Sequence, residues 1–202
     1  MICKGTVVDA TIKQAQVKSE SQRNKDSSFT KRGSKTIYGY KGHVGVDFKS
    51  NVIRSVEFTP ADIRDTQKFN DLLLSIGRAV YAGKGYANSE RLDSHKRQKK
   101  LLQRQWIFCG ILDKGDRDIA LTQVQKRCNK KLSAICDDVE QPCAFFKQVL
   151  QYTRGRYFDP ACNRLQFVLS VVAYNIREKL SLNVKNNKSQ RVEYKQAAPM
   201  IA

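Results

Sequence analysis

The sequence predicts an α/β fold, in which a mixed sheet of antiparallel and parallel strands is flanked by helices. Two alternating runs between Ile37 and Phe58 are separated by Lys49–Asn51, as in an antiparallel hairpin. Short apolar runs at 79–82 and 106–112 then alternate with helical patterns, as parallel strands do. An apolar fraction of 41% in 202 residues suffices for one domain with a core.

The first half of the chain supplies the strands of the hairpin sheet. The segment "GTVVDATI" reads as a first strand with Asp9 near its C-terminal end. Residues 18–36 are polar and basic, which predicts a long mobile loop. After the hairpin, Thr59-Pro60 offers a helix start and Gly77 a helix stop, with apolar residues on one face between them.

The second half alternates strands and helices. The strand at 79–82 breaks at Gly83, and a basic segment at 95–105 precedes the strand at 106–112. A helical region around 130–150 follows, and a last helix begins with Asp159 as N-cap and Pro160 at the first helical position. Its middle is apolar nearly all round, which predicts burial. Residues 1–180 thus form one domain with the element order of an RNase H-like core, and the polar residues 181–202 predict a disordered tail.

The charge balance points to a polyanionic partner. Thirty-seven Lys and Arg against nineteen Asp and Glu give a net charge of +18. Ribosomal RNA or a membrane surface would also suit this charge. Six cysteines without a C-x-x-C pair, and only two histidines, argue against a zinc finger. Without a signal peptide or a long apolar run, we expect a cytoplasmic, nucleoid-associated bacterial protein that has no membrane partner.

Six short motifs carry a resemblance to a known family. In order, they are "VVDATI", "SKTIYGYKGHVGVD", "VEFTPADIRDTQKFNDLL", "AVYAGKGY", "VEQPCAFFKQVLQYTRGRYF" and "NRLQFVLSVVAYNIR". Together they resemble the catalytic domain of DDE-type insertion-sequence transposases of the family-five group. The resemblance covers Thr6 to Leu180 and implies a partner DNA, both transposon ends and target. It also implies strand cleavage and strand transfer during DNA transposition, with Mg²⁺ or Mn²⁺ as cofactor.

The resemblance implies which residues hold the metals. Such enzymes use two Asp and one Glu to bind two divalent cations, which activate the attacking oxygen and stabilise the leaving oxygen. By resemblance, Asp9 is the first carboxylate and Glu140 the third, while Lys147, two helical turns further on, contacts DNA ends. On the residues alone, Asp9 is equally well explained as a strand-end Asp, and Glu140 is better explained as an exposed helical Glu.

Two departures from the family pattern predict impaired chemistry. Gly83 stands where the family has its second catalytic Asp, and Cys136 stands where it has an Arg four residues before the Glu. The loop aspartates and the hairpin aspartate are not expected at the Gly83 strand end; they are Asp47, Asp113, Asp116 and Asp118. The chain begins close to the first strand, so we expect it to be N-terminally truncated.

DNA binding should survive the loss of a metal ligand, because phosphate contacts are spread over many cations. The residues expected to contact DNA are Lys31, Arg32, Lys35, Lys96, Arg97, Lys99, Lys100, Lys147, Arg154 and Arg156. Three hypotheses follow: an impaired transposase, a non-catalytic DNA-binding remnant that inhibits intact transposases, and an unrelated basic RNA-binding protein. The first two allow a homodimer or a mixed dimer with an intact transposase.

Overall fold

The computed structural model describes most of the predicted domain. It covers residues 5–16, 26–73, 78–87, 102, 104, 107–115 and 120–197, with the side chains of 137–140 and 185–197 left undescribed. Within these ranges, no helix combines the length and the hydropathy that crossing a bilayer requires.

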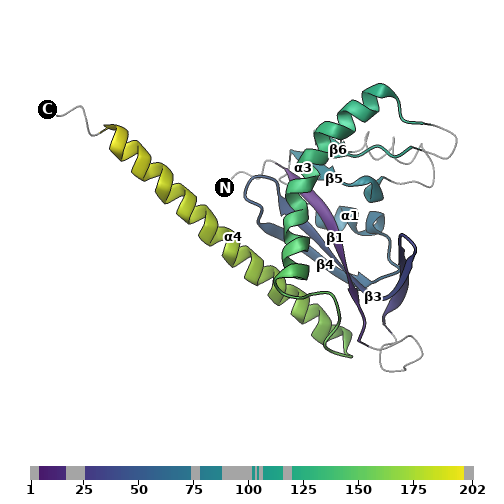
Figure 1. Cartoon of the computed structure of the whole chain (residues 1–202). Coiled ribbons are helices and arrows are strands. Elements are labelled where there is room, and N and C mark those ends of the chain that lie inside the picture. The colour runs from purple at the N-terminus through teal and green to yellow at the C-terminus, as the bar shows by residue number, and fades with distance from the viewer. Residues whose placement is uncertain are drawn as a thin grey trace.

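A six-stranded mixed sheet forms the centre of the domain, as the sequence predicts (Figure 1). Its strands are β1 (Thr6–Gln14), β2 (Ser28–Arg32), β3 (Lys35–Asp47), β4 (Ile53–Pro60), β5 (Ala79–Ala82) and β6 (Phe108–Ile111). The strand order is β2-β3-β1-β5-β6, and β4 also pairs with β3. β1 is antiparallel to β3 and parallel to β5. The antiparallel hairpin is therefore joined through β1 to the parallel strands, as in an RNase H-like sheet.

The alternation of side chains along β1 divides the core into two layers. Val7 points into a cluster with residues of two helices, α3 (Gln123–Gln148) and α4 (Pro160–Ala197). Val8 points to the opposite face, where it packs against α1 (Asp65–Leu72). Consecutive residues of β1 therefore face different helices.

Local signals fix where the helices begin. Thr122 caps α3, because its Oγ1 accepts a hydrogen bond from the Gln125 backbone N–H at 3.3 Å. At the predicted start of α4, Asp159 Oδ1 accepts a hydrogen bond from the Ala161 N–H at 2.9 Å. The predicted helix start at Thr59-Pro60 is wrong: β4 continues to Pro60, which pairs with Tyr40, and α1 begins only at Asp65. Pairing with β3 overrides the local helix signal there.

Three further expectations differ from the structure. In the predicted loop 18–36, residues 28–32 and 35–36 are strand and are joined by a tight turn in which Gly33 has φ 61°; residues 17–25 lie outside the described part. In the predicted tail 181–202, α4 continues to Ala197, and no Pro or Gly interrupts residues 181–197. The middle of α4 is buried on one face only: Phe167 is buried, whereas Leu169 is exposed.

Close packing of α4 on the sheet depends on a glycine of β3. A Cβ at Gly42 would lie 2.5 Å from Cε2 of Phe167, a contact that real Cβ atoms do not make. At Gly83, by contrast, no described atom would lie within 4 Å of a Cβ, and φ is −66°. The fold therefore requires glycine at position 42 and does not require it at position 83.

We expect Gly42→Ala to lower the free energy of unfolding by about 1–3 kcal/mol, because the new methyl group pushes Phe167 and α4 away from the sheet. Gly83→Ala is the matched control and should leave stability unchanged or raise it by up to about 1 kcal/mol. Urea denaturation followed by circular dichroism measures both variants. Equal stability of the two variants would contradict the packing role of Gly42.

Candidate functional site

A pocket of about 280 Å³ lies where β1, the β2–β3 hairpin and α3 meet. Its lining residues are Asp9, Ala10, Arg32, Cys143, Ala144, Lys147 and Gln148. Oδ1 of Asp9 accepts a hydrogen bond from the backbone N–H of Ala10 at 2.8 Å. The structure thus brings together one predicted carboxylate, Asp9, and two predicted DNA-contacting cations, Arg32 and Lys147.

The register of β1 decides which way Asp9 faces. Asp9 is directly opposite Val44 of β3, and Val44 is fully buried in the cluster that α3 and α4 complete. Paired residues of neighbouring strands share a face, so Asp9 projects from the α3 side of the sheet. This orientation agrees with its place in the pocket beside Cys143 of α3.

Gly83 follows β5 at the position beside Asp9. β5 pairs in parallel with β1, Val7 opposite Tyr81 and Val8 opposite Ala82, and the same register continues to Asp9 and Gly83. A side chain at 83 would share the face of Asp9. The Gly83 backbone is extended, with φ −66° and ψ 172°, which any L-residue adopts. Neither backbone strain nor crowding by described atoms explains glycine here.

Glu140 occupies a helical position next to the same pocket. It belongs to α3, three and four residues before Cys143 and Ala144, and seven before Lys147. Positions three, four and seven apart lie on one helix face, and those three later positions line the Asp9 pocket. The Glu140 side chain is outside the described part, so its role in the site stays a prediction.

Of the four other aspartates considered for the strand end at Gly83, two lie in the described part of the chain. Asp47 is opposite Thr6, at the other end of β1, and its Oδ2 accepts a hydrogen bond from the Ser50 hydroxyl at 2.6 Å. Asp113 comes two residues after β6, at the same sheet edge as Gly83 but after the neighbouring strand. It is one strand further from Asp9. Asp116 and Asp118 are outside the described residues.

Apart from Lys147 in the Asp9 pocket, the predicted DNA-contacting residues fall into three groups. Lys31, Arg32 and Lys35 are exposed on the β2–β3 hairpin. Lys96, Arg97, Lys99 and Lys100 lie outside the described residues, as does most of the basic segment 95–105. Arg154 and Arg156 are exposed in the loop between α3 and α4.

That loop is bound to the end of β1. The Gln14 N–H donates to the Thr153 carbonyl at 2.9 Å, and the Gly155 N–H donates to the Gln14 carbonyl at 2.6 Å. The Arg154 guanidinium donates to the Gln16 carbonyl at 3.0 Å. At least one hydrogen-bond donor of Arg154 is therefore used to hold this loop to the end of β1.

A buried charged network behind the sheet was not predicted from the sequence. Lys41 Nζ contacts Asp65 Oδ1 at 3.1 Å and donates to the Ile63 carbonyl at 2.9 Å. His43 is fully buried, with its Nε2 3.0 Å from the Thr59 hydroxyl and its Nδ1 4.0 Å from Asp65 Oδ1. Burial lowers the pKa of His43 to about 4, although the Asp65 carboxylate opposes this shift. The signal in the sequence that could have revealed this network is the placement of Lys41 and His43 at alternate positions of a buried strand.

The network reaches the loop that follows Gly83. Asp65 Oδ2 is 3.9 Å from the position that a Cβ of Gly85 would take. Tyr86 is buried against Phe69 of α1, with ring centroids 5.9 Å apart. Burial raises the pKa of Tyr86 well above its usual value, and the Asp65 and Asp9 carboxylates raise it further. α1 therefore supports the 83–86 turn from the side opposite to α3.

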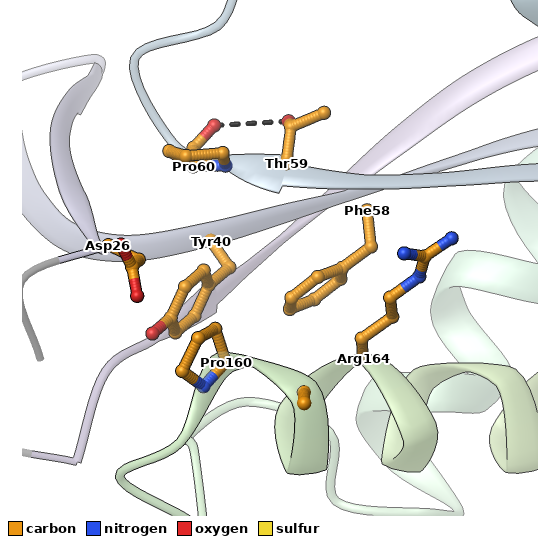
Figure 2. Close-up of a pocket in the computed structure, with 8 residues that line it drawn as sticks. Asp26, Tyr40, Phe58, Thr59, Pro60, Pro160 and Arg164 are labelled. Carbon is orange, nitrogen blue, oxygen red and sulfur yellow. Dashed lines mark hydrogen bonds between the residues drawn. The ribbon is translucent and has the colours of Figure 1, made fainter.

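A second pocket, of about 320 Å³, lies on the α4 side of the sheet (Figure 2). The rings of Tyr40 and Phe58 stack in it with centroids 5.1 Å apart, between β4 and the first turns of α4 that carry Pro160 and Arg164. Tyr40 is paired with Lys13, four residues along β1 from Asp9. This pocket shares no lining residue with the pocket around Asp9.

The described residues do not fit a two-metal site. No group of three or more His, Cys, Asp or Glu among them could hold a metal ion. The lining of the site pocket contains one carboxylate, Asp9, and the neighbouring strand end offers Gly83 instead of a ligand. Two divalent cations need several oxygen ligands between them. The described side chains are therefore too few to hold a metal pair.

Comparison with known proteins adds one match. A family model described as a transposase DDE domain matches residues 4–176. No solved structure matches the chain. The matched range includes Asp9, Gly83, Glu140 and Lys147, and it ends within α4.

The buried His43 predicts a specific acid sensitivity. Its pKa is about 4 in the folded chain and 6.5 when unfolded, so between these values the unfolded chain takes up a proton that the folded chain does not. We expect the free energy of unfolding to fall by on the order of 3 kcal/mol as the pH drops from 6.5 to 4. In His43→Gln, which cannot titrate, this part of the pH dependence should disappear from urea denaturation curves. Identical pH slopes in the two proteins would contradict the assignment.

Proposed function

The chain belongs to the transposase DDE domain family, and from this premise we propose that it is a DNA-binding transposase domain with impaired strand-cleavage chemistry. The family generally uses divalent metal ions and acts on DNA. The observation that carries the proposal is the position of Gly83, beside Asp9 on the neighbouring strand end. A carboxylate there would share the face of Asp9, and this chain has none.

The impairment follows from how such sites work. Carboxylates that hold a metal pair act as a unit, so losing one removes most of the rate. The neighbouring Asp113 is at the same sheet edge, but one strand further from Asp9 than Gly83 is. No described atom crowds a Cβ at Gly83, so the fold leaves room there for the first side-chain atom of an aspartate.

Binding of DNA needs no metal. Arg32 from the hairpin and Lys147 from α3 lie on two sides of the Asp9 pocket, and the chain carries a net charge of +18. Phosphate contacts by such cations release counterions and give sequence-independent affinity. Family membership favours DNA over RNA as the polyanion.

Replacing both Arg32 and Lys147 by Ala should weaken DNA binding by about tenfold near 0.1 M salt and reduce the slope of log Kobs against log salt by about 1–2. Fluorescence anisotropy with a labelled duplex measures both quantities. The control is Lys49→Ala, an exposed cation in the hairpin turn at the opposite end of β3.

Equal losses in the control and in the double variant would mean that the basic surface acts without a preferred site. Competition by unlabelled duplex DNA and by an RNA of equal length separates the remaining hypotheses. Stronger competition by RNA would support the basic RNA-binding alternative.

Gly83→Asp should restore a second ligand without disturbing the fold. We expect it to bind Mn²⁺ at least about tenfold more tightly than the native chain, as measured by isothermal titration calorimetry, because two carboxylates then share one face. Gly83→Asn, of the same size but uncharged, is the matched control and should bind Mn²⁺ no more tightly than the native chain.

The same proteins are then tested for nicking of supercoiled plasmid with Mg²⁺ or Mn²⁺. We expect little nicking by the native chain. Robust nicking by the native chain that Glu140→Ala abolishes would refute the proposed impairment. Metal binding by Gly83→Asp without nicking would point to a further lesion, for which Cys136 is one candidate, because the resemblance implies an Arg at that position.

A further inference from the structure

α4 carries a second apolar face that its own domain does not cover. Among the residues of this helix whose side chains the structure describes, 160–184, the exposed large aliphatic ones are Leu165, Val168, Leu169, Val172, Ile176, Leu180 and Val184, each 37–61% exposed. We call these seven residues the α4 stripe. Apart from Val168 at its edge, they are spaced by three or four residues, so they lie along one side of the helix.

The stripe lies on the opposite side of α4 from the core. Phe167, Val171 and Tyr174 face the sheet and are buried. Arg177, at the edge of the stripe, is directed toward the domain, with its guanidinium 4.8 Å from the centroid of the Phe145 ring. The exposed Lys179 and Asn183 lie on the same side of the helix, among the last stripe residues. The aliphatic side is therefore uninterrupted from Leu165 to Ile176, over about three turns, and beyond Ile176 it is shared with these two polar side chains.

The stripe also extends into a part of α4 that has no support from the domain. In Figure 1, the C-terminal half of α4 projects away from the sheet. Leu180 and Val184 belong to the C-terminal half of α4 by their residue numbers. A helical segment without tertiary contacts is marginal in water, because most helix stability in proteins comes from packing of an apolar face. A partner on the stripe would supply that packing.

The area of the stripe matches what a stable dimer needs. At their exposed fractions, the seven side chains offer on the order of 600 Å² per chain. Two such faces would bury on the order of 1,200 Å², the lower bound for a specific protein interface. Along the helix axis the stripe is about 30 Å long, because it spans the twenty residues from 165 to 184. The same patch on two copies is self-complementary about a two-fold axis.

We propose that the α4 stripe is a self-association surface, through which two copies of this chain pair along α4. A lipid surface fits less well. Interfacial helices carry a free charged face opposite the apolar face and often aromatic anchors. Here the opposite face is packed on the sheet at Phe167 and Val171, and the stripe is entirely aliphatic.

Sedimentation velocity of the full chain tests the proposal, after nuclease treatment and in about 0.5 M salt to screen the surface charge. The native chain should sediment with twice the mass of the 23.1 kDa monomer at micromolar concentration. Leu169→Glu combined with Ile176→Glu should raise the dissociation constant at least about a hundredfold, because each carboxylate would be buried in the pair. Ser181→Glu, exposed and about 140° around the helix from Ile176, is the matched control and should leave the dimer intact.

A second readout does not depend on charge. Ile176 lies near the midpoint of the stripe, so two fully overlapping stripes bring it close to its copy in either helix orientation. Ile176→Cys should give a cross-linked dimer on a non-reducing gel, and Ser181→Cys should give no more dimer than the native chain, which has its own exposed Cys128 and Cys162.

A native chain that stays monomeric up to about 100 μM overturns the proposal. So does a dimer that the double Glu variant retains. Co-sedimentation of a monomeric native chain with phosphatidylglycerol vesicles, lost in the double variant, would assign the stripe to a lipid surface instead.

Discussion

The double pairing of β1 is the constraint on which the rest of the domain depends. β1 is hydrogen-bonded to β3 on one side and to β5 on the other, so both neighbours fix its register. A slip by one residue would send Val7 to the α1 side and remove Asp9 from the α3 side. The same register places Gly83 beside Asp9. The hydrophobic core and the geometry of the site therefore have one common origin, and neither can shift without the other.

Much of this arrangement can be predicted from the sequence. The features that cannot be predicted depend on contacts between residues far apart in the chain. Period-two patterns and their breaks are local, so the strand that carries Asp9 and the strand that ends at Gly83 could both be predicted. The position of Glu140 on a helix follows from local periodicity as well. The continuation of β4 to Pro60, the ion pair of Lys41 with Asp65 and the uncovered side of α4 depend on contacts between remote segments. Local patterns carry little information about those contacts.

The glycines of this domain differ in how strongly packing constrains them. Gly42 is held in place by the Phe167 ring, and Gly45 is similarly crowded by Ser55 and the Leu72 carbonyl. At Gly83 no described atom would crowd a Cβ, so packing does not require glycine there. The proposed replacement of a metal ligand at this position would therefore leave the core contacts unchanged, and the chain would keep its sheet and its basic surface.

The hydrogen bonds between the 151–155 loop and β1 have a mechanical consequence. They tie the C-terminal end of α3, where Lys147 lies, to the strand that carries Asp9. These two walls of the pocket therefore form one rigid frame, and they cannot separate unless the bonds at Gln14 break. β5 and the 83–86 turn are attached to this frame on the other side of β1 and contribute no lining residue to the pocket. The remaining wall is the β2–β3 hairpin with Arg32, so any widening that admits a large polymer must come from the hairpin.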